Sequence, residues 1–363
     1  MPYAKSVIIA SAGSGKSTTL IREVMDNPDK RHAIVTYTNA NAAELQRKQY
    51  ELNNSPLPNL IIDTWFSFLL KHCIRPYQGA LYSQRINEML FVKGRSVPYV
   101  PENRLSQHYF SSPGQIYSDK IAKFANKLNR HANGRPIRRL ERCFDHVMFD
   151  ECQDLRAYDL DLIEVFLRAN QSTTLVGDPR QATYATNSLS KYRQYAGRNI
   201  VKKFDEWQKI GLCELINQSH SYRCNQEICN FADKFYENER DLFPLTEARN
   251  DKVTAHDGVF AVRERDVLRY MEEFNPQPLR YNRSDRTAPA NSINYGESKG
   301  LTFDRTIVFP HGPLKRYLAS GNLEHAGREI EKLYVAATRA RYSTAYVVPN
   351  NIGACILNIM YDH

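Results

Sequence analysis

The stretch that most constrains this chain is its opening, SVIIASAGSGKSTTLIREVM. Residues 7–9 form a short apolar run, which is typical of a buried parallel strand. A loop containing two glycines follows over residues 10–17, and the residues after it have the pattern of a helix. The loop has the Walker A spacing, with alanine in the first glycine position. A strand, a tight loop and a helix in this order predict a phosphate-binding site at a helix N-terminus.

Each residue type in this loop suits a phosphate ligand. Gly13 and Gly15 allow backbone N–H groups to turn inward around phosphate oxygens. Lys16 is expected to reach the β- and γ-phosphates of a nucleoside triphosphate, and the Ser17 hydroxyl is expected to hold Mg²⁺. The predicted nucleotide-binding residues of this segment are Ala12, Gly13, Ser14, Gly15, Lys16, Ser17 and Thr18. The alternative, a chance glycine-rich turn, is disfavoured by the strand before the loop and the helix after it.

A second apolar run, in DHVMFDECQD, ends in acidic residues. Residues 147–149 predict a strand, and Asp150 and Glu151 follow at its carboxyl end, where parallel sheets bind ligands. Asp150 is expected to hold Mg²⁺ through water, and Glu151 to orient and deprotonate the attacking water. Alone, such a pair often forms a solvated turn. Together with the phosphate loop, it predicts the acidic half of a nucleotide site.

A third run, STTLVGDPRQATYAT, predicts a strand over residues 173–176 and places Gln181 where a side chain could sense the γ-phosphate. Seven segments then occur in a fixed order: AGSGKST, TYTNANAAEL, DECQD, GDPRQATY, SYRCNQEI, ESKGLTFDRTIVF and KLYVAATRAR. In this order they resemble the motifs of UvrD/Rep-like superfamily 1 helicases. The resemblance covers residues 10–341, which is essentially the whole chain.

The resemblance implies an α/β fold with two RecA-like P-loop domains built on parallel sheets, and ATP in the cleft between them. Residues 1–65 and 147–214 are expected to form the first domain, residues 66–146 a reduced, helical insertion and residues 215–363 the second domain. Within the second domain, the runs GVFAV and PLRYN predict strands, and RDVLRYMEEF predicts a helix between them.

The resemblance also assigns roles to residues of the second domain. Tyr222 corresponds to the aromatic residue that stacks on the nucleotide base. Arg223 and Arg339 resemble arginine fingers, and bidentate cations suit the charge that spreads over a transferring phosphoryl group. Lys299 and Gly300 resemble the loop that couples ATP to DNA. The predicted catalytic residues are Glu151, Gln181, Arg223 and Arg339.

A single-stranded DNA interface is implied by two further motifs. TYTN resembles the first strand-binding motif of the family and DTWFSF the second. Threonine hydroxyls in them are expected to bind phosphate, and aromatic rings to stack or wedge. The predicted DNA-binding residues are Thr36, Tyr37, Asn39, Thr64, Trp65, Phe66 and Tyr184. For Trp65 and Phe66, burial in the core is an open alternative.

The sequence departs from the family pattern in three places. Family members usually carry an N-terminal segment with a glutamine that reads adenine; this chain is expected to lack it, so that base recognition depends on Tyr222. Thr186 stands where the family usually has tryptophan, and Asn187 where it usually has arginine. These changes predict weak gripping of single strands. No segment is long enough for the family's 2B subdomain.

Charge and composition agree with a nucleic-acid partner. Lys and Arg number 49 against 40 Asp and Glu, a net charge of +9. A basic run over residues 130–142 is explained equally well by phosphate contacts and by a solvated helical face. The 7 cysteines form no C-x-x-C pair, which is typical of reduced thiols in a cytoplasmic protein. No apolar stretch reaches transmembrane length, so a membrane partner is not expected.

These patterns favour a DNA-dependent ATPase of the UvrD-like helicase class that uses ATP and Mg²⁺ on single-stranded or end-containing DNA. An alternative is a nucleotide-gated regulatory or scaffold subunit with little helicase activity. A nuclease is not supported, because no acidic cluster with metal spacing occurs outside the nucleotide site. UvrD-like proteins occur beside OLD-type ATPase-nucleases in Gabija-type antiphage systems, so the resemblance implies an OLD-type nuclease partner and a role in antiviral defence.

Overall fold

The computed structural model describes residues 4–184, 186–187, 189–351 and 357–361. The chain divides into two compact units. The first unit comprises Met1–Ile9, Lys16–Pro179 and Tyr184–Ile216, and the second comprises Ala10–Gly15, Arg180–Thr183 and Asn217–His363. The first half of the phosphate loop and a short segment containing Gln181 therefore pack with the C-terminal part of the chain.

The first unit is built on a six-stranded sheet in the order β3-β2-β7-β8-β1-β9. Its strands are β1 (Lys5–Ala10), β2 (His32–Thr36), β3 (Leu60–Thr64), β7 (His146–Phe149), β8 (Ser172–Gly177) and β9 (Glu214–Gln218). Parallel pairing joins β3, β2, β7, β8 and β1. All four residues of β7 and all five of β2 are buried, as their continuous apolar character predicts for central parallel strands.

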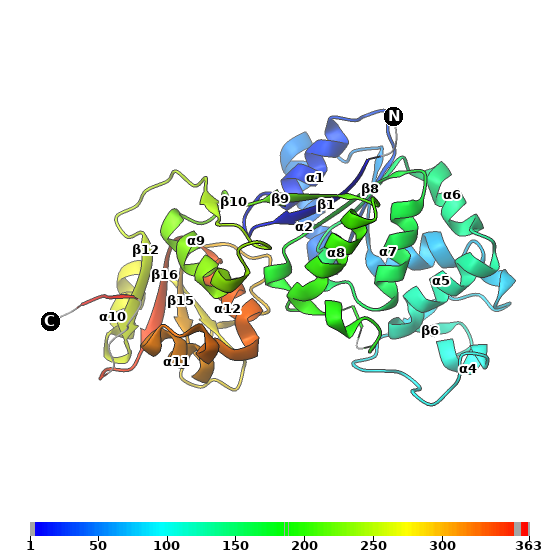
Figure 1. The fold of residues 1–363 in the computed structure, drawn as a ribbon. Coiled ribbons are helices and arrows are strands. Elements are labelled where there is room, and N and C mark those ends of the chain that lie inside the picture. The colour runs from blue at the N-terminus through cyan, green and yellow to red at the C-terminus, as the bar shows by residue number, and fades with distance from the viewer. Residues whose placement is uncertain (1–3, 185, 188, 352–356, 362–363) are drawn as a thin grey trace. The chain divides into compact units, whose positions relative to one another are not determined.

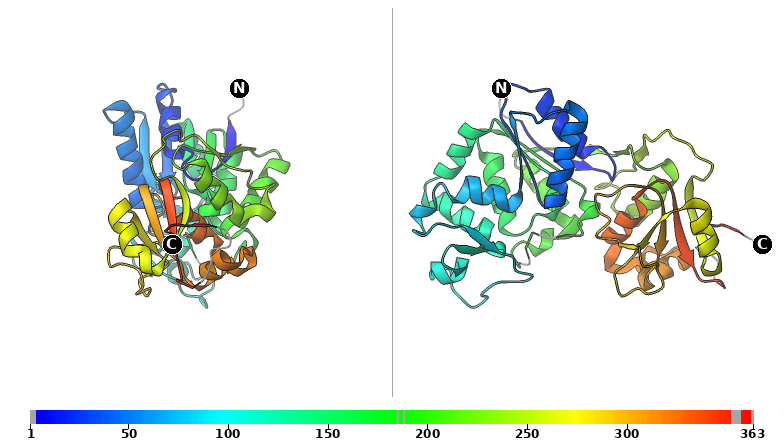
Figure 2. Two further views of the ribbon diagram at one scale, coloured as in Figure 1. Left: turned by 90° about the vertical axis from the view of Figure 1, so that its left-hand side faces the viewer. Right: turned by 180° about the vertical axis from the view of Figure 1, so that it is seen from behind.

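Helices cover both faces of this sheet. Those that flank it are α1 (Lys16–Met25), α2 (Asn39–Asn53), α7 (Tyr158–Arg168) and α8 (Ile200–Lys209). The helices α1 and α2 lie on one face, and α7 and α8 on the other (Figures 1 and 2). Strands β7 and β8 lie between β2 and β1, so the chain passes over both positions on its way from β1 to β2 and fills them after β3. Both the phosphate loop and Asp150 follow strands at this carboxyl edge of the sheet, where ligands bind in such folds.

The insertion after β3 packs within the first unit. Its helical elements are α3 (Trp65–Phe68), a π-helix (Leu69–Ile74), α4 (Leu105–Tyr109), α5 (Ile121–His131) and α6 (Arg135–Cys143). The sequence predicts a helical insertion, but the segment also contains a three-stranded sheet of β4 (Glu88–Leu90), β5 (Phe110–Ser112) and β6 (Gln115–Tyr117). Each of these strands has only three residues, which is too short for an alternating pattern to be recognised in the sequence.

The second unit contains a six-stranded sheet in the order β14-β13-β15-β16-β12-β17, and all its pairs are parallel. Its strands are β12 (Gly258–Arg263), β13 (Gln277–Arg280), β14 (Ile293–Asn294), β15 (Phe303–Phe309), β16 (Ala340–Val348) and β17 (Asn358–Ile359). Its helices are α9 (Gln226–Asp233), α10 (Val267–Phe274), α11 (Gly312–Ser320) and α12 (Ile330–Ala337). A two-stranded pair, β10 (His220–Ser221) and β11 (Glu247–Ala248), lies apart from this sheet.

Alternation along β12 explains how helices cover the second sheet. Val262 packs with Tyr270 of α10 on one face. Val259 packs with Ile228 of α9 on the other face. The predicted strands at GVFAV and PLRYN and the predicted helix between them are confirmed. The predicted fold class, α/β with parallel sheets in two P-loop-type domains, is therefore confirmed.

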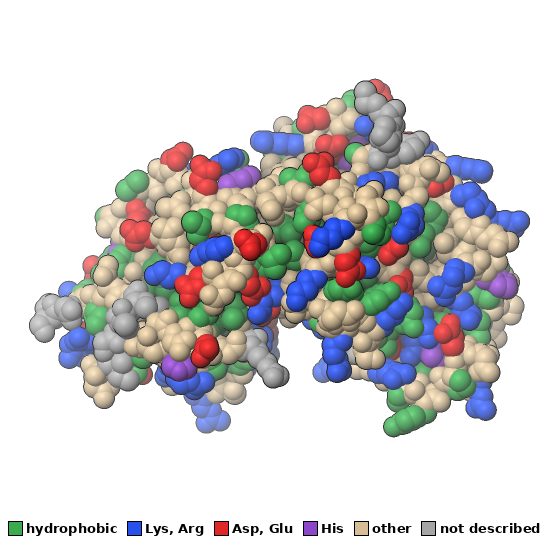
Figure 3. Space-filling model, viewed as in Figure 1, with side chains coloured by type: hydrophobic (Ala, Val, Ile, Leu, Met, Phe, Trp, Pro, Cys, Tyr) green, Lys and Arg blue, Asp and Glu red, His purple; other side chains and the backbone are tan. Residues whose placement is uncertain are grey.

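Charged side chains of both signs are mixed on the face seen in Figure 3. Figure 3 shows Lys and Arg side chains spread over the visible face and interspersed with Asp and Glu. The basic run over residues 130–142 includes α6, which buries Ile137 and Leu140 and exposes Arg135 and Arg138. No helix within the described ranges is both long and apolar enough to cross a membrane.

Candidate nucleotide site and DNA interface

The phosphate loop takes the backbone conformation that its glycines allow. Gly13 and Gly15 have φ angles of +75° and +83°, which L side chains rarely adopt. A Cβ atom on Gly13 would also lie only 2.5 Å from the Cβ of Arg223. Tyr222 donates its backbone N–H to the Gly13 carbonyl at 2.9 Å. The segment that carries Tyr222 and Arg223 is thus fixed against the loop within the second unit, as the proposed roles of these residues require.

A buried carboxylate oxygen of the first unit suits a bound magnesium ion. Asp150 Oδ1, just after β7, is buried and has no hydrogen-bond partner among the described residues. Burial and the charge of Glu151 raise the pKa of Asp150 to about 7, while the Lys16 ammonium opposes that shift. A cation would stabilise such a carboxylate, and Mg²⁺ prefers oxygen ligands. Asp150 and the hydroxyl of Ser17 are therefore suitable residues to hold Mg²⁺.

Glu151, the predicted general base, is held by a residue that the sequence analysis did not assign. Gln153 donates its side-chain amide to the Glu151 carboxylate, and its amide oxygen accepts from the backbone N–H of Asp178 at 3.1 Å. A Cβ on Gly177 would collide with that amide oxygen, so glycine there lets Gln153 keep its position. Gln153 thus connects the acidic motif to the turn after β8. Its place inside DECQD was the signal available in the sequence.

Gln181 and Arg339 come together in the second unit. Arg339 Nη2 donates to Gln181 Oε1 at 3.0 Å. Arg339 is only 1% exposed, and its guanidinium also donates to the carbonyls of Val335, Ser298 and Leu301. The last two carbonyls flank the predicted coupling residues Lys299 and Gly300. Arg339 is therefore a buried residue that connects Gln181 with the backbone around Lys299 and Gly300, which its motif did not indicate.

Tyr222 and Arg223 are more accessible than Arg339. Tyr222 is 55% exposed, and its ring lies beside Gly15, where a Cβ atom would be 3.6 Å from Tyr222 Cδ2. Arg249 donates to the Tyr222 hydroxyl at 3.2 Å. Arg223 is half-buried and donates to the carbonyl of Thr338 at 3.1 Å. An exposed ring next to the phosphate loop has the accessibility that base stacking requires.

A buried ring of polar residues, which the sequence did not predict, holds Ser11 of the phosphate loop within the second unit. Arg180 pairs with Asp233 at 3.3 Å and donates to Ser11 Oγ at 2.7 Å. Thr246 donates its hydroxyl to Asp233 at 3.0 Å. Since that proton is used, Ser11 donates its own to Thr246 Oγ1, 3.2 Å away, and accepts from Arg180. All four side chains are at most 4% exposed.

The DNA-binding prediction divides into exposed and buried residues. Asn39 and Tyr184 are exposed, and Tyr37 is half-buried. Thr64 caps α3 by accepting from the backbone N–H of Ser67 at 3.4 Å. Trp65 is 2% exposed and donates its indole N–H to Asp159 at 3.1 Å. Phe66 is 8% exposed. For Trp65 and Phe66 the structure therefore favours the core alternative over direct stacking on a base.

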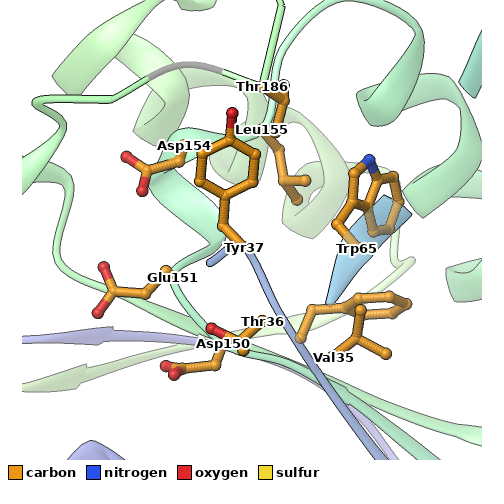
Figure 4. Close-up of a pocket in the computed structure, with 10 residues that line it drawn as sticks. Val35, Thr36, Tyr37, Trp65, Asp150, Glu151, Asp154, Leu155 and Thr186 are labelled. Atoms are coloured by element: carbon orange, nitrogen blue, oxygen red, sulfur yellow. The ribbon is translucent and has the colours of Figure 1, made fainter. Parts of the chain in front are cut away.

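A small cavity links the two motifs within the first unit. It has a volume of about 10 Å³, room for about one water molecule, and is lined by Val35, Thr36, Tyr37, Trp65, Phe149, Asp150, Glu151, Asp154, Leu155 and Thr186 (Figure 4). Asp150 donates its backbone N–H to the Val35 carbonyl, so Thr36 and Asp150 follow adjacent positions on neighbouring strands. Thr36 Oγ1 is buried and has no partner among the described residues. The expected DNA motif thus begins beside the expected magnesium ligand.

A family model described as UvrD/REP helicase N-terminal domain matches residues 2–90 and 103–188. This matched part of the chain belongs to the UvrD/Rep helicase family. Two solved structures of arterivirus nonstructural protein 10 (helicase), one of them a complex with DNA, each share 13% sequence identity over 96% of this chain, with a TM-score of 0.47. The chain spans 61% and 60% of the lengths of those two chains. No curated protein matches the chain.

Thr186 and Asn187, which differ from the residues usual in the UvrD/Rep family, form hydrogen bonds inside the first unit. Thr186 is 6% exposed and donates its hydroxyl to Asp159, and Asn187 donates its amide to the same carboxylate at 3.1 Å. Trp65 and the backbone N–H of Arg156 also donate to Asp159. Burial raises the pKa of Asp159 to about 6, against these hydrogen bonds. Thr186 and Asn187 therefore support a buried carboxyl group and offer no stacking platform.

Proposed function

We propose that this chain is a DNA-dependent nucleoside triphosphatase of the UvrD-like helicase class, which couples ATP hydrolysis to the binding or translocation of single-stranded DNA. The observation that carries the proposal is the combination of Lys16, at the start of α1, with the buried and unpartnered Asp150 oxygen at the end of β7. An ammonium group and a carboxylate that act on each other at the carboxyl edge of a parallel sheet suit a phosphate–magnesium ligand. Membership of the helicase family supports the choice of reaction.

In the proposed reaction, the loop N–H groups and Lys16 hold the phosphates. Glu151 accepts a proton from the attacking water, and Gln153 keeps the Glu151 carboxylate in place through its amide hydrogen bond. When bound, Mg²⁺ would neutralise charge on the phosphate oxygens, with Ser17 and Asp150 as its protein ligands.

Arginine side chains of the second unit are proposed to oppose the charge that develops on the transferring phosphoryl group. Arg223 is half-buried and makes one hydrogen bond to a carbonyl, so little needs to change for it to act. Arg339 is bonded to Gln181 and to three backbone carbonyls, so it reaches a phosphate only by exchanging a partner. Gln181 would report the presence of the γ-phosphate to Arg339 through their shared hydrogen bond.

The test is hydrolysis by the purified chain with and without oligo(dT). We expect Lys16→Ala to weaken binding of the triphosphate, and Glu151→Gln to retain binding but to stop turnover. Lys30→Ala, a change at an exposed lysine outside the site, is the matched control. Turnover by Glu151→Gln at the wild-type rate would remove Glu151 as the general base.

A second candidate function is a nucleotide-gated regulatory or scaffold subunit. The observation in its favour is that Thr186 and Asn187 point to Asp159, which leaves no platform at these positions for gripping a strand. This candidate predicts nucleotide binding with slow hydrolysis that oligo(dT) does not stimulate. The proposed motor predicts clear stimulation, so the same assay separates the two.

The proposal extends to an assembly with an OLD-type nuclease in antiphage defence, where nucleotide turnover on DNA would license cleavage by the partner. The inward-facing Thr186 and Asn187 support it, since a weak grip on DNA must be completed by another surface. Co-purification of the chain with the products of neighbouring genes tests this extension. Elution as a lone monomer, with hydrolysis fully stimulated by DNA alone, would count against it.

A further inference from the structure

A row of three aromatic rings runs from the first DNA motif into the insertion of the first unit. The ring centroids of Tyr37 and Phe66 are 5.9 Å apart, and those of Phe66 and Phe91 are 5.6 Å apart. Phe66, in the middle, is 8% exposed, whereas Phe91, at the end, is 69% exposed. Phe66 therefore lies between Tyr37 and Phe91 and contacts both rings. Most of the surface of the Phe91 side chain is open to a ligand.

Phe91 begins a loop of aromatic and basic residues, FVKGRSVPY, over residues 91–99. Lys93, Arg95 and Tyr99 are exposed, and Tyr99 is 96% exposed. The loop contains no acidic residue. Gly94, between the two basic residues, has only open space where a Cβ would lie. In Figure 1 this stretch belongs to the long cyan connection that leads to α4.

Buried polar contacts hold the backbone of this 91–99 loop against residues 118–120. Ser96 donates its backbone N–H and its hydroxyl to Asp119 at 3.0 and 2.6 Å. Lys120 donates to the Ser96 carbonyl at 3.0 Å, and Val92 donates its N–H to Ser118 Oγ at 3.1 Å. Ser96, Ser118, Asp119 and Lys120 are all at most 8% exposed. Because the loop backbone is held in place, its exposed rings and cations can meet a ligand without the entropy cost of ordering a free loop.

We propose that the 91–99 loop is a stacking surface for single-stranded nucleic acid, in which a base stacks on Phe91 and the neighbouring phosphates contact Lys93 and Arg95. Alternating rings and cations fit a strand of stackable bases joined by negative phosphates. The row through Phe66 to Tyr37 makes this surface continuous with the predicted DNA motif. It would supply the platform that Thr186 does not provide. The inference rests on the proposed DNA-dependent function.

The experiment measures binding of fluorescein-labelled oligo(dT) by anisotropy. We expect Phe91→Ala to weaken binding about 5- to 150-fold, the range for one stacked base. Binding of an abasic strand of the same length should be insensitive to Phe91→Ala, because it offers no base to stack. Lys93→Gln and Arg95→Gln should each lower the slope of log affinity against log salt by about 1. Tyr50→Ala, at another exposed ring of the same unit, should bind oligo(dT) like the wild type.

A direct readout comes from Phe91→Trp. This variant should retain affinity, and its fluorescence should be quenched by oligo(dT). The wild type gives the baseline, since its 2 tryptophans, Trp65 and Trp207, are buried. Oligo(U) as a second ligand distinguishes RNA from DNA as the physiological strand. Wild-type affinity of a folded Phe91→Ala, or absence of quenching in Phe91→Trp, would overturn the proposal.

The outcomes also separate this inference from the motor function. If DNA stimulates hydrolysis but Phe91→Ala binds oligo(dT) with wild-type affinity, the stacking surface is refuted and the motor function stands. Quenching of Phe91→Trp without any hydrolysis would keep the surface and remove the motor. A Phe91→Ala defect confined to a protein partner, with unchanged oligonucleotide binding, would reassign the surface to protein contact.

Discussion

Arg339 donates a hydrogen bond to the side-chain oxygen of Gln181 at 3.0 Å, although 158 positions separate them in the chain. Gln181 is 6% exposed and Arg339 is 1% exposed, so the bond is shielded from solvent. Bonds in such surroundings are strengthened and are costly to break. The two residues are therefore expected to act as a pair, and a change to either should be felt by the other.

Substitution of this pair should have non-additive effects on hydrolysis. Gln181→Ala and Arg339→Lys should each lower kcat, since lysine cannot reproduce the planar fork of arginine. The double variant should be about as slow as the slower single variant, because each change already breaks the shared bond. Steady-state ATPase assays of the four proteins provide the cycle. Purely multiplicative effects would show that Gln181 and Arg339 act independently.

Removal of one partner from the buried Arg180–Asp233 pair should destabilise the protein strongly. Asp233→Ala leaves the Arg180 charge buried at 2% exposure, a change that typically costs about 3–5 kcal/mol. The double variant Arg180→Met with Asp233→Leu should recover much of that loss, because no unpaired charge remains. Urea unfolding measures both. Lys209→Ala, which breaks an exposed pair with Asp205, is the control and should change the unfolding midpoint little.

Restoring the family's tryptophan at position 186 should not restore a grip on DNA. Thr186 is 6% exposed and donates to Asp159, so a tryptophan there has no room and removes that bond. Overpacking of this kind costs about 1–3 kcal/mol. We expect Thr186→Trp to lower the melting temperature without tightening oligo(dT) binding. A variant of unchanged stability that binds oligo(dT) more tightly would contradict the inward placement of Thr186.

Acid should destabilise the first unit through His146. Burial and the neighbouring charge of His32 lower the pKa of His146 to about 4, from an ordinary value of 6.5. Between these two pH values the unfolded chain binds more protons than the folded chain, so stability falls as the pH falls. His146→Gln, which can keep a hydrogen bond to Thr174, should reduce this fall. Melting curves from pH 7 to about pH 4 test it, with the exposed His131→Gln as the control.

Some features of this protein follow from short segments of sequence. The phosphate loop needs only a strand, the glycines at 13 and 15 and a helix, and all of these lie within one stretch of chain. The acidic strand end at Asp150 and Glu151 is likewise local. Strand β12, helix α10 and strand β13 could be predicted because their apolar periodicity is set by neighbouring residues. Local backbone geometry and local periodicity are the physical reasons that these predictions succeed.

Other features depend on residues that only folding brings together. Asp159 lies far from Trp65 in sequence, yet it accepts the indole N–H and turns Trp65 into a core residue. The same carboxylate draws Thr186 inward. Asp233 and Ser11 likewise bury Arg180, and Phe66 brings the insertion's Phe91 next to the DNA motif. Whether a side chain is buried in a structural role or exposed to a ligand depends on the surfaces packed around it. Those surfaces come from distant parts of the chain. The sequence alone therefore determined which residue types stand in the proposed nucleotide site, while the tertiary structure decided which aromatic and charged side chains remain exposed to a ligand.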